Sequence, residues 1–342
     1  MKKQIIIGTV CAVAIITAAG ITVIKGGQSS DIKSTAPAEQ KPAGASVMAQ
    51  PEFYRGIYLT QPSGKNLDTL KKLVEGAKKS NFNVMVIDVQ PAPNGKTSIP
   101  KENVDYLIAN GIYPIARVVC FDGGLKSFPI EESVLQNKIA IAKSACEIGF
   151  PEIQFDYIRF NDDGFLTKIP TQKKAEFIEG FLSRAKNELK PYNVKIAADV
   201  FGRIPLNSND SIGQRMEGLD NIVDVICPMA YPSHYTWSEK MMKDPYYTVY
   251  TTSVKGRDRV KKAQIVSYIQ AFKIKVGKSG LTYDEYVLQQ IKACHDAKIK
   301  GYILWNARQD YIVPFKVAEN YYKDKNIAQI NNTAAGKKPS AL

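Results

Sequence analysis

Short runs rich in β-branched and aromatic residues alternate with longer amphipathic segments between about residue 55 and residue 307 of this 342-residue chain. Such alternation predicts repeated βα units around a parallel sheet. Eight runs favour a closed TIM (βα)8 barrel of the α/β class over an open doubly wound sheet, and no glycine-rich phosphate loop follows the first run. The predicted strands are residues 55–60, 83–90, 113–121, 152–160, 195–202, 224–231, 264–270 and 301–307.

The segments between the predicted strands have helical periodicity. In residues 66–80, for example, apolar side chains recur three or four positions apart. We expect Asn66 and Thr282 to cap the helices that they precede, and Gly149 to end the helix before it. The other segments with this pattern are residues 131–148, 171–189 and 282–297.

An uncharged, mainly apolar stretch occupies residues 5–24, after Lys2 and Lys3. Twenty helical residues span roughly 30 Å, enough to cross the hydrocarbon core of a bilayer. The two lysines should stay in the cytoplasm, so everything after residue 25 is expected outside it. Two alternatives remain open: an uncleaved signal anchor in a single-pass cell-membrane protein, or a signal peptide cut near residues 17–19, which would make the protein secreted.

The domain organisation follows from composition. Residues 1–25 are the signal anchor or signal peptide, and residues 26–50 are rich in Gly, Ser, Ala, Pro and Gln, which predicts a flexible linker. Residues 51–325 are expected to form the barrel as a single domain. Residues 326–342 are expected to be a polar C-terminal tail.

The charge and the metal-binding residue types limit the partners. A formal charge of +13 fits either a solvated basic surface or attraction to an anionic cell envelope, and no nucleic-acid motif accompanies it. His234 and His295 are the only histidines, and no closely spaced cysteine pair occurs, so no metal site or cofactor is expected. The cysteines among apolar neighbours are expected to be buried free thiols.

Three carboxylates stand within apolar strands, where burial costs several kcal/mol unless partners compensate it. They are Asp88, Asp156 and Asp199. Glycoside hydrolysis explains such groups, because it uses one carboxyl group as acid and another as nucleophile or base. Asp156 and Asp199 would come from neighbouring strands roughly 4.8 Å apart. They are the expected catalytic pair, with the stereochemistry and the division of roles left open and Asp88 in support.

Aromatic and polar residues follow the predicted strands, at the end of the barrel where active sites lie. An aromatic ring can stack on the apolar face of a sugar while polar side chains bind its hydroxyl groups. The substrate is therefore expected to be a polysaccharide or oligosaccharide. The candidate substrate-binding residues are Asp88, Tyr157, Arg159, Tyr231, His234, Tyr235, Gln270, Trp305 and Asn306.

At these strand ends the chain resembles the bacterial putative glycosyl hydrolase domain family, formerly a domain of unknown function. The most specific matching pieces are Phe-Asp-Tyr-Ile-Arg-Phe at residues 155–160 and Tyr-Pro-Ser-His-Tyr at residues 231–235. The other matching pieces lie in family order between residue 55 and about residue 310. The resemblance implies a (βα)8 fold, frequent attachment to the membrane or wall, and glycosidase activity by kinship to sugar-cleaving barrels. An envelope or extracellular polysaccharide is the substrate that we expect.

Two other functions remain open on the same scaffold. A non-catalytic, surface-anchored carbohydrate-binding barrel would keep the aromatic rim without needing two carboxylates near one bond. A polysaccharide deacetylase would need a metal cluster of Asp and His, which two isolated histidines do not favour. A hydrolase of O-glycosyl bonds is the leading hypothesis.

Overall fold

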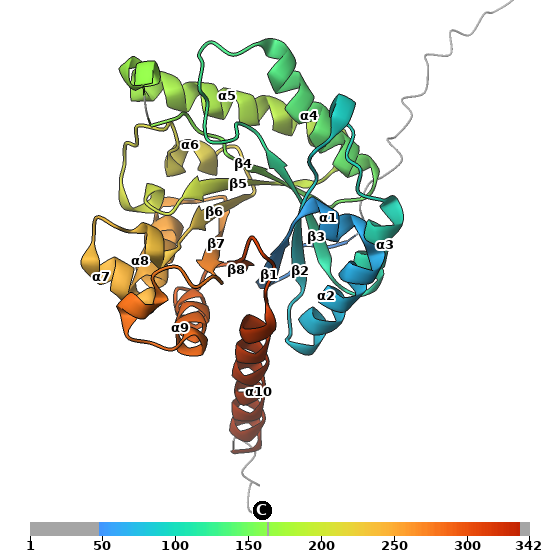
Figure 1. Ribbon diagram of the computed structural model, residues 1–342, viewed down its shortest axis with the longest axis vertical. Coiled ribbons are helices and arrows are strands. Elements are labelled where there is room, and N and C mark those ends of the chain that lie inside the picture. Colours follow the sequence, from blue (N-terminus) through green and yellow to red (C-terminus); the bar gives the residue numbers. More distant parts are fainter. Residues whose placement is uncertain (1–47, 163, 336–342) are drawn as a thin grey trace, which may run out of the picture. The chain divides into compact units, whose positions relative to one another are not determined.

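The computed structural model describes residues 48–162 and 164–335. Eight parallel strands pair in sequence order, and β8 pairs with β1 to close the barrel (Figure 1). The predicted (βα)8 barrel is confirmed. Its strands are β1 (Tyr54–Leu59), β2 (Val84–Asp88), β3 (Tyr113–Val119), β4 (Glu152–Asp156), β5 (Lys195–Phe201), β6 (Val225–Met229), β7 (Gln264–Gln270) and β8 (Gly301–Trp305).

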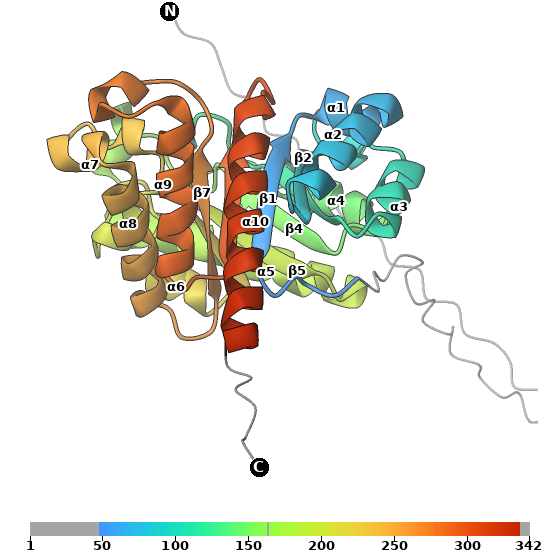
Figure 2. The same cartoon turned by 90° about the horizontal axis from the view of Figure 1, so that it is seen from below.

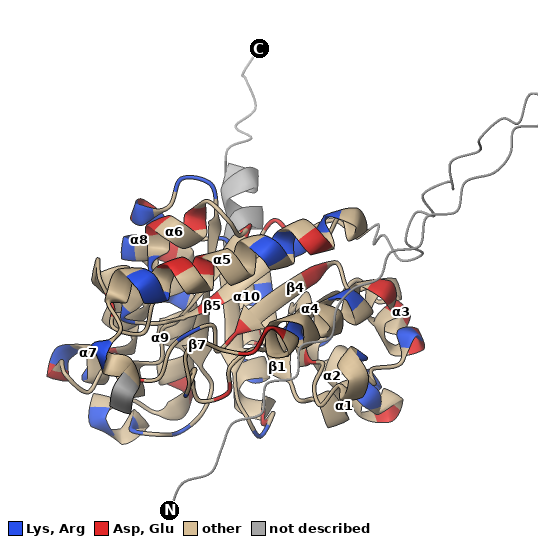
Figure 3. Ribbon diagram, turned by 90° about the horizontal axis from the view of Figure 1, so that it is seen from above, with Lys and Arg blue, Asp and Glu red and all other residues tan. Residues whose placement is uncertain are grey.

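Helices surround the barrel (Figures 1 and 2). The α-helices are α1 (Gln61–Lys65), α2 (Leu67–Lys79), α3 (Lys101–Ala109), α4 (Glu132–Glu147), α5 (Thr171–Leu189), α6 (Met216–Asp220), α7 (Glu239–Lys243), α8 (Pro245–Arg259), α9 (Tyr283–Asp296) and α10 (Ile312–Ala335). Short 3₁₀ turns occur in the loops, among them η4 (Ile204–Leu206) and η5 (Pro232–His234). Figure 3 shows Lys and Arg on α3, α5 and α8, with acidic residues between them.

The expected helix ends are confirmed. The Asn66 side chain accepts a hydrogen bond from the backbone N–H of Thr69 at 2.8 Å at the start of α2. At the start of α9, Thr282 and Glu285 form a reciprocal capping box. Gly149 follows α4 with φ +106°, a left-handed conformation that glycine adopts without steric cost.

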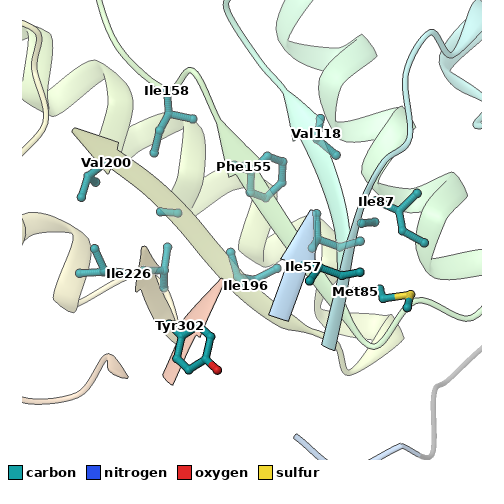
Figure 4. Close-up of a cluster of buried hydrophobic side chains, with 14 of the residues drawn as sticks. Ile57, Met85, Ile87, Val118, Phe155, Ile158, Ile196, Val200, Ile226 and Tyr302 are labelled. Carbon is teal, nitrogen blue, oxygen red and sulfur yellow. The ribbon is translucent and has the colours of Figure 1, made fainter. Parts of the chain in front are cut away.

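Alternate residues of each strand face opposite sides of the barrel wall. Phe155 of β4 points outward into the apolar cluster between strands and helices, which Figure 4 shows in part. The positions on either side of it face the interior. There Gln154 accepts a hydrogen bond from Tyr268 at 2.6 Å, and Asp156 contacts Arg117. The same alternation brings side chains from every strand to the carboxyl end of the interior.

Glu152 lies at the opposite, amino-terminal end of the barrel interior. It is completely buried and accepts a hydrogen bond of 2.6 Å from Tyr54. Burial raises the pKa of Glu152 from 4.5 to about 7, although the hydrogen bond from Tyr54 works against the rise. The carboxyl group is therefore held in its neutral form at mildly acidic pH.

Replacing Glu152 with glutamine is expected to make stability less dependent on pH. The folded-state pKa lies above the unfolded value, so the wild-type protein loses stability as the pH rises from about 4.5 to about 7, by roughly 3 kcal/mol. Glutamine does not ionise. The unfolding free energy of Glu152→Gln, measured by urea titration, should therefore increase relative to that of the wild-type protein as the pH rises across this range.

Glu188 provides the control for this prediction. It lies on the surface, where Lys143 and Arg184 lower its pKa, so Glu188→Gln should change the pH dependence in the opposite direction. Parallel pH profiles for the wild-type protein and Glu152→Gln would contradict the assignment of a neutral, buried Glu152.

Several predicted boundaries differ from the structure. β4 was expected to reach residue 160 but ends at Asp156, because Tyr157 adopts a left-handed conformation with φ +54° that turns the chain out of the sheet. α10 extends as far as Ala335, into the segment that is expected to be a polar tail from residue 326. The described cysteines are buried and free, as predicted.

The predicted membrane segment and most of the predicted linker lie outside the described residues. Within the described part of the chain, none of the helices combines the length and the apolar character needed to span a bilayer.

Candidate active site

A cavity of about 330 Å³ opens at the carboxyl end of the strands. Strands β3 to β8 all contribute side chains to its wall, together with the loops that follow β4, β5 and β6. This is the end of the barrel where TIM-barrel enzymes place their active sites. The cavity is lined by Arg117, Asp156, Tyr157, Arg159, Asp199, Phe201, Gly202, Arg203, Gln214, Met229, Tyr231, His234, Tyr235, Trp237, Tyr268 and Trp305.

Arg117 joins the three strand carboxylates at the floor of this cavity. Its guanidinium forms ion pairs with Asp88 and Asp156, and its Nε lies 3.0 Å from Oδ2 of Asp156 and 3.9 Å from Oδ2 of Asp199. Strand register explains the meeting, because Asp88 and Arg117 are direct partners across β2 and β3. Burial opposes the charge on Arg117, but Asp156 and Asp88 outweigh it and raise its pKa.

Asp156 is held in one orientation as a charged acceptor. Its Oδ2 is bound by Arg117, and its Oδ1 accepts a hydrogen bond of 2.5 Å from the backbone N–H of Tyr157. Tyr157 itself has a left-handed backbone, with φ +54°. Unusual backbone conformations of this kind occur often at functional sites.

Asp199 has a different environment. Its side chain is 1% exposed, and neither carboxyl oxygen has a hydrogen-bond partner within 3.5 Å, although the thiol of Cys227 lies close by. Burial raises the pKa of Asp199 well above 3.8, the charge of Asp156 raises it further, and Arg117 opposes both. The site therefore places a carboxylate that is ion-paired with Arg117 beside a second carboxyl group whose pKa is raised, and such a pair can accept and donate a proton.

Aromatic side chains form much of the cavity wall. Trp305 packs on Tyr58, with ring centroids 3.9 Å apart, and lies near Arg117, whose guanidinium carbon is 5.0 Å from the ring centroid. Trp237 contacts Tyr235 at 5.0 Å and is 60% exposed. Trp237 is not among the residues predicted from the sequence, although its position two residues after the Tyr-Pro-Ser-His-Tyr piece could have indicated it.

A pair of arginines borders the cavity beside β5. Arg159 and Arg203 both stack on the ring of Phe201, with guanidinium carbons 4.7 and 5.0 Å from its centroid. Arg159 is among the predicted substrate-binding residues, whereas Arg203 and Phe201 are not. Both arginines thus place a guanidinium group on this side of the cavity wall.

His234, Tyr231 and Tyr235 come from the loop after β6, as predicted, and all three line the cavity. His234 lies in η5, with its ring 5.3 Å from that of Tyr231. Burial lowers the pKa of His234 below 6.5, and the charge of Lys275 acts in the same direction. The imidazole is therefore neutral at neutral pH and can both donate and accept a hydrogen bond.

Two predicted sugar-binding residues instead hold loops in place. Gln270 is completely buried, where it accepts a hydrogen bond from the N–H of Ser233 and donates to the carbonyl groups of Phe272 and Ile274. Asn306 donates to the carbonyl groups of Ala271 and Asp310 and accepts from Arg308. Neither side chain lines the cavity.

The remaining predicted residue, Asp88, lies just behind the cavity wall. Arg117 and Tyr58 bind its two oxygens, the latter at 2.5 Å, and its side chain is 19% exposed. This geometry is compatible with the supporting role that we predicted for Asp88. Across the described residues, no group of His, Cys, Asp and Glu side chains has an arrangement able to hold a metal ion.

The comparisons with solved structures give barrels of the same kind. The glycoside hydrolase domain of PgaB (BpsB) from Bordetella bronchiseptica has a TM-score of 0.58 at 13% identity, covering 78% of this chain and 97% of that one. The endo-β-1,4-mannanase from Thermotoga petrophila has a TM-score of 0.57 at 14% identity, covering 80% and 77%. The spore cortex-lytic enzyme SleL from Bacillus megaterium has a TM-score of 0.54 at 10% identity, covering 79% and 75%. At these identities the likeness concerns the fold.

The sequence comparisons are more specific. No curated protein matches the chain. A family model described as putative glycosyl hydrolase domain matches residues 126–311, which is more than half of the chain and includes Asp156, Asp199 and most of the cavity wall. The chain belongs to this family, the putative glycosyl hydrolase domain family, as its sequence motifs had indicated.

Proposed function

We propose that the protein is a glycoside hydrolase that cleaves O-glycosidic bonds of a cell-envelope or extracellular polysaccharide with two carboxyl groups. One observation carries the proposal: buried Asp199, with a raised pKa and no hydrogen-bond partner for its oxygens, shares a cavity with charged Asp156. Two such groups are what glycoside hydrolysis requires.

The two carboxyl groups have different roles in this mechanism. Asp199 acts as the general acid, because its raised pKa keeps the proton that the leaving oxygen must receive. Asp156 remains charged beside Arg117 and acts as the nucleophile or as the base that activates water. Asp88 shares the charge of Arg117 and keeps this guanidinium in place.

The aromatic wall supports a glycan as the ligand. Trp305 and Trp237 offer ring faces at two positions along the cavity, and Tyr231, His234 and Arg159 offer hydrogen-bonding groups. The similar barrels include a mannanase and a spore cortex-lytic enzyme, so an extended polysaccharide is the proposed substrate. The N-terminal apolar stretch supports a location outside the cytoplasm, at the membrane or secreted.

A non-catalytic carbohydrate-binding barrel is the second candidate. Both oxygens of Asp156 are already occupied by Arg117 and the Tyr157 N–H, which would weaken the carboxylate as a nucleophile. Reducing-end release from purified wall and extracellular polysaccharides separates the two functions. Release by the wild-type protein that is lost in Asp156→Asn and Asp199→Asn, with both variants folded, establishes the hydrolase. Binding without release by all three proteins supports the binding module.

Replacing Trp237 with alanine is expected to weaken binding of long oligosaccharides. The ring is 60% exposed, so its loss should leave the fold intact and remove a stacking surface, raising KM about tenfold with little change in kcat. Initial rates on a series of oligosaccharide lengths measure this effect. Ile312→Ala, which removes another exposed apolar side chain outside the cavity, should leave KM unchanged. An equal effect of both substitutions would count against a stacking role.

A further inference from the structure

Arg159 differs from the other two arginines of the cavity in its charge balance. Arg117 is ion-paired with Asp88 and Asp156, and Arg203 is paired with Asp210, at 2.8 Å between Nε and Oδ2. Among the residues that the structure describes, no carboxylate lies within 4.0 Å of the Arg159 guanidinium. Its positive charge is therefore left without a direct counter-charge in the cavity wall.

The guanidinium of Arg159 is nevertheless held in place. Its Nη1 donates a hydrogen bond of 3.1 Å to the carbonyl of Phe160, and its face stacks on Phe201. Gly124 makes room for it: a Cβ at this position would come within 2.7 Å of Nη1, and the backbone there has φ +88°. Because these contacts fix the planar group, little side-chain entropy remains to be lost when a ligand binds.

The environment of the Arg159 side chain is energetically unfavourable when no ligand is bound. Nε is buried and has no hydrogen-bond partner. Burial lowers the pKa of Arg159, and nearby Arg203 acts in the same direction, while the more distant charges of Asp162 and Asp156 offset only part of this. A bound oxyanion would offset both effects, since it supplies the missing counter-charge and hydrogen-bond acceptors.

We propose that Arg159 binds an oxyanion substituent of the glycan, a carboxylate or a phosphate, and that the substrate class is therefore an acidic polysaccharide. This inference rests on the proposed function in taking the ligand to be a glycan in this cavity. A rigid guanidinium without a counter-charge selects for such a group, because its fork of N–H donors matches two oxyanion oxygens. The formal charge of +13 favours approach of an anionic polymer.

The test is calorimetric binding to the full-length protein with three probes of equal length. They are an oligoglucuronate, the same oligomer with its carboxyl groups reduced to alcohols, and an oligosaccharide of uncharged sugars joined by anionic phosphodiesters. The wild-type protein should bind one of the charged oligomers about tenfold to a hundredfold more tightly than the reduced oligomer, with the preference falling as salt increases. Which charged oligomer binds distinguishes carboxylate from phosphate.

Matched variants assign the preference to Arg159. Arg159→Gln should bind the charged and reduced oligomers equally, and Arg159→Lys should keep part of the preference because it retains the charge without the fork. Arg184→Gln removes one positive charge from the surface of α5 and should keep the full preference. Thermal melting checks that all variants are folded.

Equal affinity of the wild-type protein for charged and reduced oligomers, no measurable binding of either charged oligomer, or a preference that survives in Arg159→Gln would each overturn the inference. Reducing-end release in the same samples keeps the two proposals separate. Cleavage without a charge preference refutes only the acidic substrate class, whereas a charge preference without cleavage refutes only the hydrolase.

Discussion

Replacing Asp199 with asparagine is expected to lower kcat on an unactivated polysaccharide by about a hundredfold to ten-thousandfold, the range for loss of a general acid. Asparagine keeps the shape of the side chain but has no acidic proton to give to the leaving oxygen. The fold should survive, because the carboxyl group is neutral in the wild-type protein and has no hydrogen-bond partner to lose, apart from the weakly interacting Cys227 thiol.

Two measurements distinguish loss of the acid from general damage. An aryl glycoside with a good leaving group needs little proton donation, so its cleavage should fall far less in Asp199→Asn than in Asp156→Asn. The wild-type rate should decline at high pH as Asp199 loses its proton, and since its pKa is raised, this decline should lie well above pH 3.8. This decline at high pH should be absent from the pH profile of Asp199→Asn.

Asp258→Asn is the control for these experiments. It makes the same chemical change at an exposed carboxylate beside Arg257, away from the cavity, and should leave both the rate and the pH profile unchanged. An Asp199→Asn protein that keeps the wild-type rate on polysaccharide would remove Asp199 from the mechanism.

The barrel could be predicted because its signals are local and repeated. Each strand is a short apolar run, each following helix has its own periodicity, and both Asn66 and Thr282 lie where a cap is needed. The ends of the strands were less predictable. Residues 157–160 continue the apolar and aromatic composition of β4, and only the left-handed turn at Tyr157 removes them from the sheet. Such a turn has no clear signal in a tyrosine.

The site could be predicted in its centre but not at its edges. Asp156 and Asp199 stand out because a carboxylate in an apolar strand requires an explanation, and strand alternation fixes the side to which they point. Loops have no such rule. Gln270 and Asn306 also occur at strand ends, yet they bind loop backbone, whereas Trp237 reaches the cavity from the middle of a loop.

Arg117 is not among the site residues predicted from the sequence, but it forms ion pairs with all three strand carboxylates. The sequence does not reveal that three carboxylates surround one guanidinium, because this arrangement depends on the stagger of β2 to β5 around the barrel. This sharing also explains how Asp156 and Asp199 differ. The guanidinium binds Asp156 directly and lies 3.9 Å from Asp199, which leaves the second carboxyl group under the influence of burial.

Replacing Arg117 with methionine is expected to cost about 3–5 kcal/mol of unfolding free energy, because it leaves buried carboxylates without their cation. The side chain is 5% exposed, so water cannot replace the lost contacts. Urea unfolding at several pH values measures the effect. The deficit relative to the wild-type protein should be largest at neutral and high pH and should shrink in acid, where protonation relieves the uncompensated charge.

A double variant tests whether electrostatics causes this loss. Asp156→Asn added to Arg117→Met removes one of the stranded charges and should recover part of the stability, whereas loss of packing alone would not be recovered. Arg184→Met, at an exposed ion pair on α5, should leave the unfolding free energy nearly unchanged. If Arg117→Met is as stable as the wild-type protein at neutral pH, Asp88 and Asp156 do not depend on its charge. The ion pairs of Arg117 would then not account for the burial of Asp88 and Asp156 at the cavity floor.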